Sequence, residues 1–210
     1  MRALVHHPRQ REAEPLWLEW LTLAGGLAFC TWLLGVRGVW GLLLGADPTG
    51  LTLVITAVFL CSTIWCGQRS RELQRQRQLL AAPRDGEASW AAEYLKSPGE
   101  AATDVLLEHS HGPHGTAWWV NGIQLKLGLL GKVIGFSMLA LSIGKLHSFD
   151  PSQSQELLRS LTAGLGVALL TTMVGLVGNI LLGLQLTRLD RFADALVADI
   201  QKAGLKKEGG

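Results

Sequence analysis

The stretch VALLTTMVGLVGN, from Val167 to Asn179, lies inside the last long apolar run of the chain and indicates a membrane helix with one distinct face. At about 100° per residue, its small and polar residues fall within roughly a third of the helix circumference. With the preceding Gly164, this stripe consists of Gly164, Ala168, Thr171, Thr172, Gly175, Gly178 and Asn179. Apolar side chains gain nothing from leaving lipid for a helix interface, because lipid tails are equally apolar. A stripe of small and polar residues therefore predicts a face that packs against other helices or lines a polar path.

The composition indicates a membrane protein. Hydrophobic residues make up 48% of the chain and charged residues 17%, and the apolar residues form long runs instead of the scattered pattern of a soluble core. The net charge of +2 gives no indication of a nucleic-acid partner, and the basic residues lie beside apolar runs, where anionic lipid would meet them. The spacing of Cys30, Cys61 and Cys66 fits neither a zinc site nor a disulfide framework.

Apolar runs predict four membrane-spanning helices, at about residues 16–36, 51–66, 120–146 and 161–186. The polar segment HSFDPSQSQ, from His147 to Gln155, predicts a turn that joins the last two into a hairpin. A signal peptide is the competing account of the first run, but that run is long, carries Glu19 and lacks a small-residue cleavage site. We therefore expect an all-α membrane protein with four transmembrane helices and helical cytoplasmic extensions.

The positions of lysine and arginine predict the orientation. These residues are concentrated before the first run, between the second and third runs, and after the fourth, so both termini and the middle loop are expected in the cytoplasm. The middle loop is too short for an enzyme domain, and no enzymatic function is predicted. The expected organisation is a cytoplasmic N-terminus at 1–15, a first transmembrane pair at 16–66, cytoplasmic loop and helices at 67–119, a transmembrane hairpin at 120–187 and a cytoplasmic amphipathic tail at 188–210.

The third run carries a second motif, GLLGKVIG, from Gly128 to Gly135. This motif, the stretch VALLTTMVGLVGN and the four-span layout together resemble the MotA/TolQ/ExbB proton-channel family. The resemblance covers the membrane hairpin, and the LTT followed by G and N is similar to the flagellar stator branch. Because the cytoplasmic loop is much shorter than in flagellar stators, a flagellar role is disfavoured.

The resemblance implies an ion-driven motor subunit in the bacterial inner membrane. Such subunits form a homopentamer around a single-span MotB/TolR/ExbD-like partner, whose membrane aspartate carries protons or sodium ions, and no cofactor other than the transported ion is implied. Thr172 matches the threonine that lines the ion path of the family, and Thr171 matches its neighbour. Asn179 matches the asparagine of the stator branch, and Gly175 matches the glycine that lets helices approach. Membrane lipid is a further expected partner.

Lys132 stands where the family carries threonine. It lies about 9 Å deeper than Lys126, and it shares a sector of its helix with Gly128, Gly131 and Gly135. Lipid exposure of a charged lysine at depth costs at least about 2.5 to 3.5 kcal/mol. We therefore expect Lys132 on the ion path, facing a ring lumen and the aspartate of the partner. The alternative is a long side chain that reaches the cytoplasmic interface and binds lipid phosphate.

Other readings stay open. The hydroxyls of Thr171 and Thr172 can bond back to carbonyls one turn earlier and serve packing alone, and Asn179 can form an interhelical hydrogen bond. The segment HSHGPH, from His109 to His114, is predicted to be an exposed polar turn, not a metal site. A non-conducting helical scaffold is the alternative function. The residues expected to pack helices together are Gly131, Gly135, Gly164, Gly175, Gly178 and Asn179.

Overall fold

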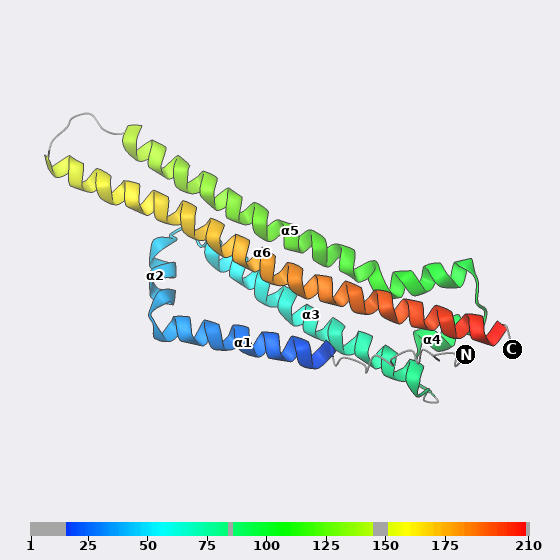
Figure 1. Ribbon diagram of the computed structural model, residues 1–210. Coiled ribbons are helices and arrows are strands. Elements are labelled where there is room, and N and C mark those ends of the chain that lie inside the picture. Colours follow the sequence, from blue (N-terminus) through cyan, green and yellow to red (C-terminus); the bar gives the residue numbers. More distant parts are fainter. Residues whose placement is uncertain (1–15, 84–85, 145–150, 209–210) are drawn as a thin grey trace, which may run out of the picture.

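The computed structural model describes residues 16–83, 86–144 and 151–208, and these form helices and their connections without any strand. In chain order the helices are α1 (Leu16–Val36), α2 (Val39–Ala46), α3 (Leu51–Ala81), α4 (Trp90–Tyr94), α5 (Glu100–Gly144) and α6 (Pro151–Glu208) (Figure 1). Four of them, α1, α3, α5 and α6, are long and apolar enough to cross a membrane. The prediction of an all-α membrane protein is confirmed.

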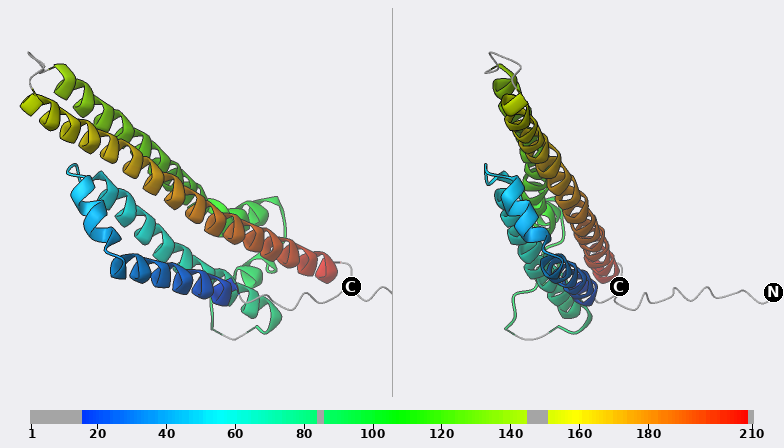
Figure 2. Two further views of the ribbon diagram at one scale, coloured as in Figure 1. Left: turned by 60° about the vertical axis from the view of Figure 1, so that its left-hand side comes forward. Right: turned by 90° about the vertical axis from the view of Figure 1, so that its left-hand side faces the viewer.

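Helices α5 and α6 form a long antiparallel hairpin and lie side by side (Figures 1 and 2). With 45 and 58 residues they are about 68 and 87 Å long. The hydrocarbon core of a bilayer is only about 30 Å thick, so both helices continue well beyond it. The predicted turn at 147–155 is too long, because residues 151–155 already belong to α6. Pro151 begins that helix, where its missing N–H leaves no hydrogen bond unmade; residues 147–150 lie outside the described residues.

A short apolar helix, α2, connects α1 to α3 and was not predicted from the sequence (Figure 1). Gly38 and Gly50 precede α2 and α3 with φ of 72° and 70°, a conformation that favours glycine. The carboxylate of Asp47 accepts hydrogen bonds from the backbone N–H groups of Thr49 at 3.0 Å and Thr52 at 2.7 Å. Burial alone would raise the pKa of Asp47, but these bonds hold it below its usual value and fix the start of α3.

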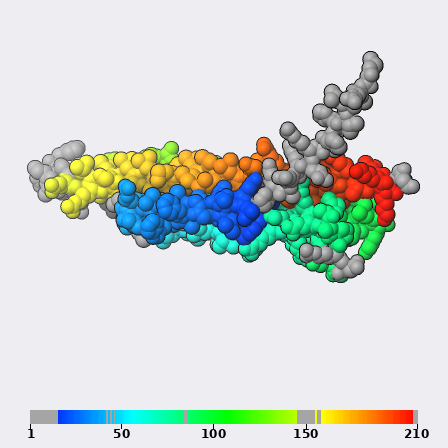
Figure 3. All heavy atoms as spheres, turned by 60° about the horizontal axis from the view of Figure 1, so that its bottom comes forward, coloured from blue at the N-terminus to red at the C-terminus, as the bar shows by residue number. Residues whose placement is uncertain are grey.

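The buried core lies mainly where the polar extensions of the helices meet. Leu186, Leu189, Leu196 and Ile200 of α6 are at most 1% exposed and pack in one cluster with Leu73 of α3. The amphipathic tail predicted at 188–210 belongs to α6 as far as Glu208, and within the chain it packs against α3 and α4. Figure 3 shows the elongated body, with α1 along one side.

The membrane segments, by contrast, expose large apolar side chains. Leu141 and Leu169 are each 67% exposed, on α5 and α6 respectively. Such a surface is stable in contact with lipid or with further membrane helices, because both are as apolar as the side chains themselves.

The prediction of an exposed polar turn at HSHGPH is wrong. The segment lies inside α5, with Pro113 within the helix, and α5 changes direction in this N-terminal part (Figure 1). His114 is only 2% exposed. The reason lies in a side chain from another helix, described below.

Candidate functional site

Five glycines let α5 and α6 approach closely, four of them backbone against backbone and Gly131 against the side chain of Thr171. We call them the glycine seam: Gly128, Gly131 and Gly135 of α5, and Gly164 and Gly175 of α6. A Cβ atom on Gly175 would lie 2.9 Å from the carbonyl oxygen of Gln124, and one on Gly164 would lie 2.9 Å from the carbonyl oxygen of Gly135. Separations this short do not occur for real Cβ atoms, so no larger residue fits without moving the helices apart.

Thr171 lies in the seam. Its side chain fills the space that a Cβ atom of Gly131 would need, and Thr171 is fully buried. The hydroxyl donates to the carbonyl of Val167, one turn earlier, at 2.7 Å. Thr171 is therefore enclosed between α5 and α6 within a single chain.

Thr172 lies at the margin of the same interface and is half-buried. Its hydroxyl oxygen is 2.7 Å from the carbonyl oxygen of Ala168 and 3.2 Å from that of Gly128. A hydroxyl has one proton to donate, and the lone pairs of its oxygen remain able to accept. Thr172 can therefore bridge the two helices and still accept a hydrogen bond from the open side.

Amide side chains continue the polar face toward the core. The Asn179 Nδ2 donates to the carbonyl of Asn121 on α5 at 2.9 Å. Gln124 is fully buried, and neither its Oε1 nor its Nε2 has a hydrogen-bond partner among the described residues. A Cβ atom on Gly178 would lie 2.6 Å from Gln124 Oε1, so Gly178 makes room for this amide. Two polar residues, Asn121 and Gln124, on one face of an apolar run were the signal that sequence reasoning missed.

Lys132 lies on the exposed surface of α5. Its ammonium is 6.0 Å from the centre of the Phe136 ring, at the limit of a cation–π interaction. Among the described residues, no carboxylate forms an ion pair with Lys132. The structure therefore brings Thr171, Thr172, Asn179 and the glycines together in one interface, and leaves Lys132 outside it.

A second polar group, which we call the histidine cluster, consists of Arg69 of α3, His111 and His114 of α5, and Asp190 and Asp194 of α6. The Nδ1 of His114 lies 2.6 Å from Asp190, and its Nε2 lies 3.3 Å from the Nε of Arg69. His111 lies 3.1 Å from Asp194. Sequence reasoning missed this cluster because its acids lie 76 and 83 residues from their histidines.

Arg69 also explains why α5 continues through Pro113. In a helix the N–H of residue 113 would bond to the carbonyl of residue 109, but proline has no N–H. The guanidinium of Arg69 donates to that carbonyl of His109, and to the carbonyl of Ser110 at 2.9 Å. A donor from α3 thus replaces the missing backbone donor, and the helix bends instead of ending.

The histidine cluster lies outside the apolar segment, which begins near Val120. The pKa of His114 lies below its ordinary value, mainly because burial disfavours the charged ring. The hydrogen bond to Asp190 raises this pKa, whereas the positive charge of Arg69 lowers it further. Neutral His114 fits the geometry, with Nδ1–H donating to Asp190 and Nε2 accepting from Arg69. The cluster therefore joins three helices through a histidine whose pKa lies below its ordinary value.

Two other arrangements of polar side chains bear on function. No group of three metal-ligating residues comes together in residues 16–83, 86–144 and 151–208. Ser110, His111 and Asp194 are linked at 2.7 and 3.1 Å, in the manner of a hydrolase triad. However, Ser110 is fully buried, so this hydroxyl has no access to a substrate.

Comparisons with known proteins give no match: no family model, no curated protein and no solved structure is similar to this chain.

Proposed function

We propose that the chain is the channel-forming subunit of an ion-driven membrane motor of the MotA/TolQ/ExbB type. In this proposal, copies assemble into a ring, with five as the expected number, in the bacterial inner membrane with both termini in the cytoplasm. A single-span partner with a membrane aspartate occupies the centre. Protons or sodium ions pass between that aspartate and the polar residues of the ring.

The observation that carries the proposal is the position of Lys132. It lies 12 residues from Val120 and 12 from Gly144, so it is about 18 Å from either end of the apolar part of α5. In a single chain it is exposed between Val133 and other apolar side chains. A charged lysine against lipid at this depth costs at least about 2.5 to 3.5 kcal/mol, whereas a polar lumen between copies removes much of that cost.

The hairpin supports the proposal further. Tight packing at the glycine seam joins α5 and α6 into one rigid unit that can line an ion path. Thr172 lies at the margin of this seam, and its hydroxyl oxygen can still accept a hydrogen bond. Hydroxyls that accept from a hydrated ion and donate to a carboxylate suit an ion path. Thr172 and Lys132 are the proposed ion-path residues that remain accessible from the surface, whereas Thr171 acts from within the seam.

A non-conducting scaffold is the second candidate, and the burial of Thr171 favours it. In this alternative the small residues serve helix packing, and Lys132 binds an acidic partner or a lipid phosphate. The two candidates differ in whether ions pass through the assembly.

The test is to copurify the full chain with a single-span protein encoded beside it and to count subunits by native mass spectrometry. The complex is then reconstituted in liposomes, and proton and sodium flux are measured under a membrane potential. The motor proposal expects a ring of five chains, potential-driven flux, and altered flux in Lys132→Met but not in the control Lys126→Met. Chains that stay single, or assemblies that pass neither ion, would contradict it.

A further inference from the structure

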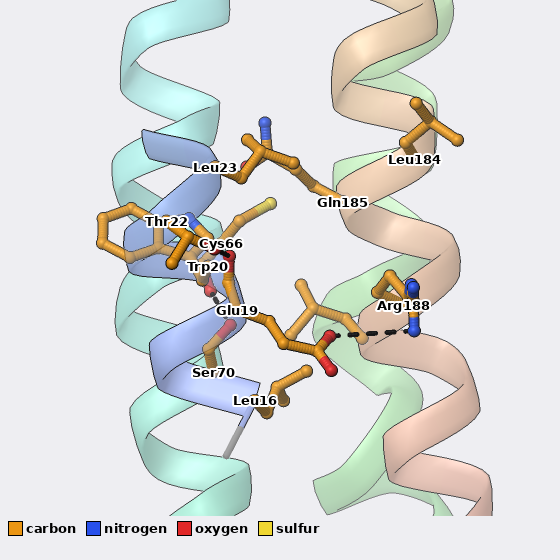
Figure 4. Close-up of a pocket in the computed structure, with 11 residues that line it drawn as sticks. Leu16, Glu19, Trp20, Thr22, Leu23, Cys66, Ser70, Leu184, Gln185 and Arg188 are labelled. Carbon is orange, nitrogen blue, oxygen red and sulfur yellow. Dashed lines mark hydrogen bonds and ion pairs between the residues drawn. The ribbon is translucent and has the colours of Figure 1, made fainter. Parts of the chain in front are cut away.

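A groove of about 720 Å³ opens between α1, α3 and α6 (Figure 4). Its walls are mainly apolar, and they include Trp20 and Leu23 of α1 and Leu184 and Leu189 of α6. The groove lies at the end of the membrane segment where α1 begins and where α6 continues into its polar extension. This is the depth at which a lipid headgroup meets its acyl chains.

Two opposite charges stand side by side at the groove. Glu19 of α1 points toward Arg188 of α6, and their Oε2 and Nη1 atoms are 3.7 Å apart (Figure 4). The side chains are 40% and 65% exposed, respectively, so both can reach a ligand. Exposed ion pairs of this kind add little to the stability of the fold, so separating the two side chains costs little. Each charge can therefore pair with a group of opposite charge on a bound molecule.

Deeper in the groove, Gln185 carries an unpaired polar atom. Gln185 is 5% exposed, its Nε2 lies 3.3 Å from the hydroxyl of Thr63, and its Oε1 has no hydrogen-bond partner among the described residues. If the amide is turned over, Thr63 donates to the oxygen and the NH₂ group becomes the unpaired one. In either orientation one amide atom of Gln185 lacks a partner among the described residues, and because that atom is buried it meets a ligand in the groove only when the side chain rotates.

We propose that this groove binds a phosphatidylethanolamine molecule. The ammonium of the lipid pairs with Glu19, its phosphate with Arg188, and an ester carbonyl accepts from the turned amide of Gln185. An acyl chain then follows the apolar walls. Gln185 and Arg188 lie three residues apart on α6, about 4.5 Å along its axis, so the amide sits one step below the phosphate, as the ester does in the lipid.

The charge pair selects this headgroup over other common ones. A primary ammonium offers three N–H donors to the carboxylate of Glu19, whereas the methylated ammonium of phosphatidylcholine offers none. Phosphatidylglycerol has no cation to balance Glu19. This site is separate from the proposed ion path, so the inference holds whether or not the chain conducts ions.

The test uses the full chain in phosphatidylcholine nanodiscs that contain a trace of phosphatidylethanolamine with a photoreactive group on its acyl chain. Labelled peptides are mapped by mass spectrometry and are expected at residues 16–23 and 184–189. Unlabelled phosphatidylethanolamine should compete about tenfold better than phosphatidylcholine or phosphatidylglycerol.

Variants make the test specific. Glu19→Gln and Arg188→Gln should each reduce labelling about threefold to tenfold, whereas Arg191→Gln, an exposed arginine one turn further along α6, should leave it unchanged. Leu23→Trp keeps both charges and narrows the groove, so it should also reduce labelling. This variant tests the proposal independently if a charge variant fails to fold. Labelling that is the same for all three headgroups, or labelling outside the two segments, would overturn the proposal.

Discussion

The side chain of Arg69 donates a hydrogen bond to the backbone carbonyl of His109, the oxygen that Pro113 leaves without its helical donor. The same guanidinium lies 3.3 Å from the Nε2 of His114. One residue of α3 therefore determines both the course of α5 and the hydrogen bonding of its buried histidine.

Replacing Arg69 by methionine should destabilise the fold by about 2 to 4 kcal/mol. The variant leaves the carbonyl of His109 and the Nε2 of His114 without a donor in a partly buried region, and unsatisfied groups of this kind are costly. Thermal unfolding in detergent, followed by circular dichroism, measures the loss. The control is Arg75→Met, because Arg75 is 51% exposed and should change stability by no more than about 0.5 kcal/mol.

Restoring the backbone N–H should relieve part of this loss. In the Arg69→Met background, Pro113→Ala gives residue 113 a donor for the carbonyl of His109, so the double variant should be more stable than Arg69→Met alone. A double-mutant cycle isolates the coupling, and we expect about 1 kcal/mol or more. Effects that simply add would show that Arg69 does not replace the missing donor.

Stability should fall in mild acid because of His114. Its pKa in the folded protein lies below the ordinary value of 6.5, since burial disfavours the charged ring, so the unfolded chain binds the proton more readily. The stabilisation is fully present above pH 6.5 and is lost as the pH falls below it. Melting temperatures at pH 7.5 and 5.5 should therefore differ more for the parent protein than for His114→Gln. The control is His109→Gln, which should behave like the parent because the side chain of His109 is exposed.

The glycine seam should tolerate no added methyl group. Gly175→Ala places a Cβ atom 2.9 Å from the carbonyl of Gln124 and should cost about 1 to 3 kcal/mol. Gly122→Ala, in the same membrane segment of α5, meets no atom within 4 Å and should be neutral or slightly stabilising. Unfolding measured in the same detergent compares the two, and equal stabilities would contradict the close contact.

The two threonines should respond differently in the flux assay. Thr172→Val removes the hydroxyl of this half-buried side chain and should lower potential-driven flux, whereas Thr172→Ser keeps the hydroxyl and should retain most of the flux. Thr171→Val keeps the shape of a fully buried side chain and should affect stability more than flux. Equal flux in Thr172→Val and the parent would remove Thr172 from the proposed ion path.

Much of the fold could be predicted because membrane helices are specified by local hydropathy. The first span was expected at residues 16–36, and α1 has the same bounds. The short helix α2 was missed because its eight residues are too few for a periodic signal. The helix through HSHGPH was missed for another reason, since its missing hydrogen bond is supplied by Arg69, 40 residues away from His109.

The candidate site was predictable only in part. Periodicity places Thr171, Thr172 and Gly175 on one face of a helix, but it does not say what lies opposite. In the structure α5 lies there, with Gly131 against Thr171 and Gly128 near Thr172. The partner of a stripe depends on the register between two helices, and that register is set by many distant contacts.

Backbone contact along the seam has a mechanical consequence. Because backbone lies against backbone at four of these glycines and the side chain of Thr171 fills the space at Gly131, α5 and α6 cannot slide or twist past each other without steric overlap. The hairpin should tilt as a single strut, and because α6 extends far past the bilayer, a small tilt within the membrane becomes a larger sideways displacement at its distant tip.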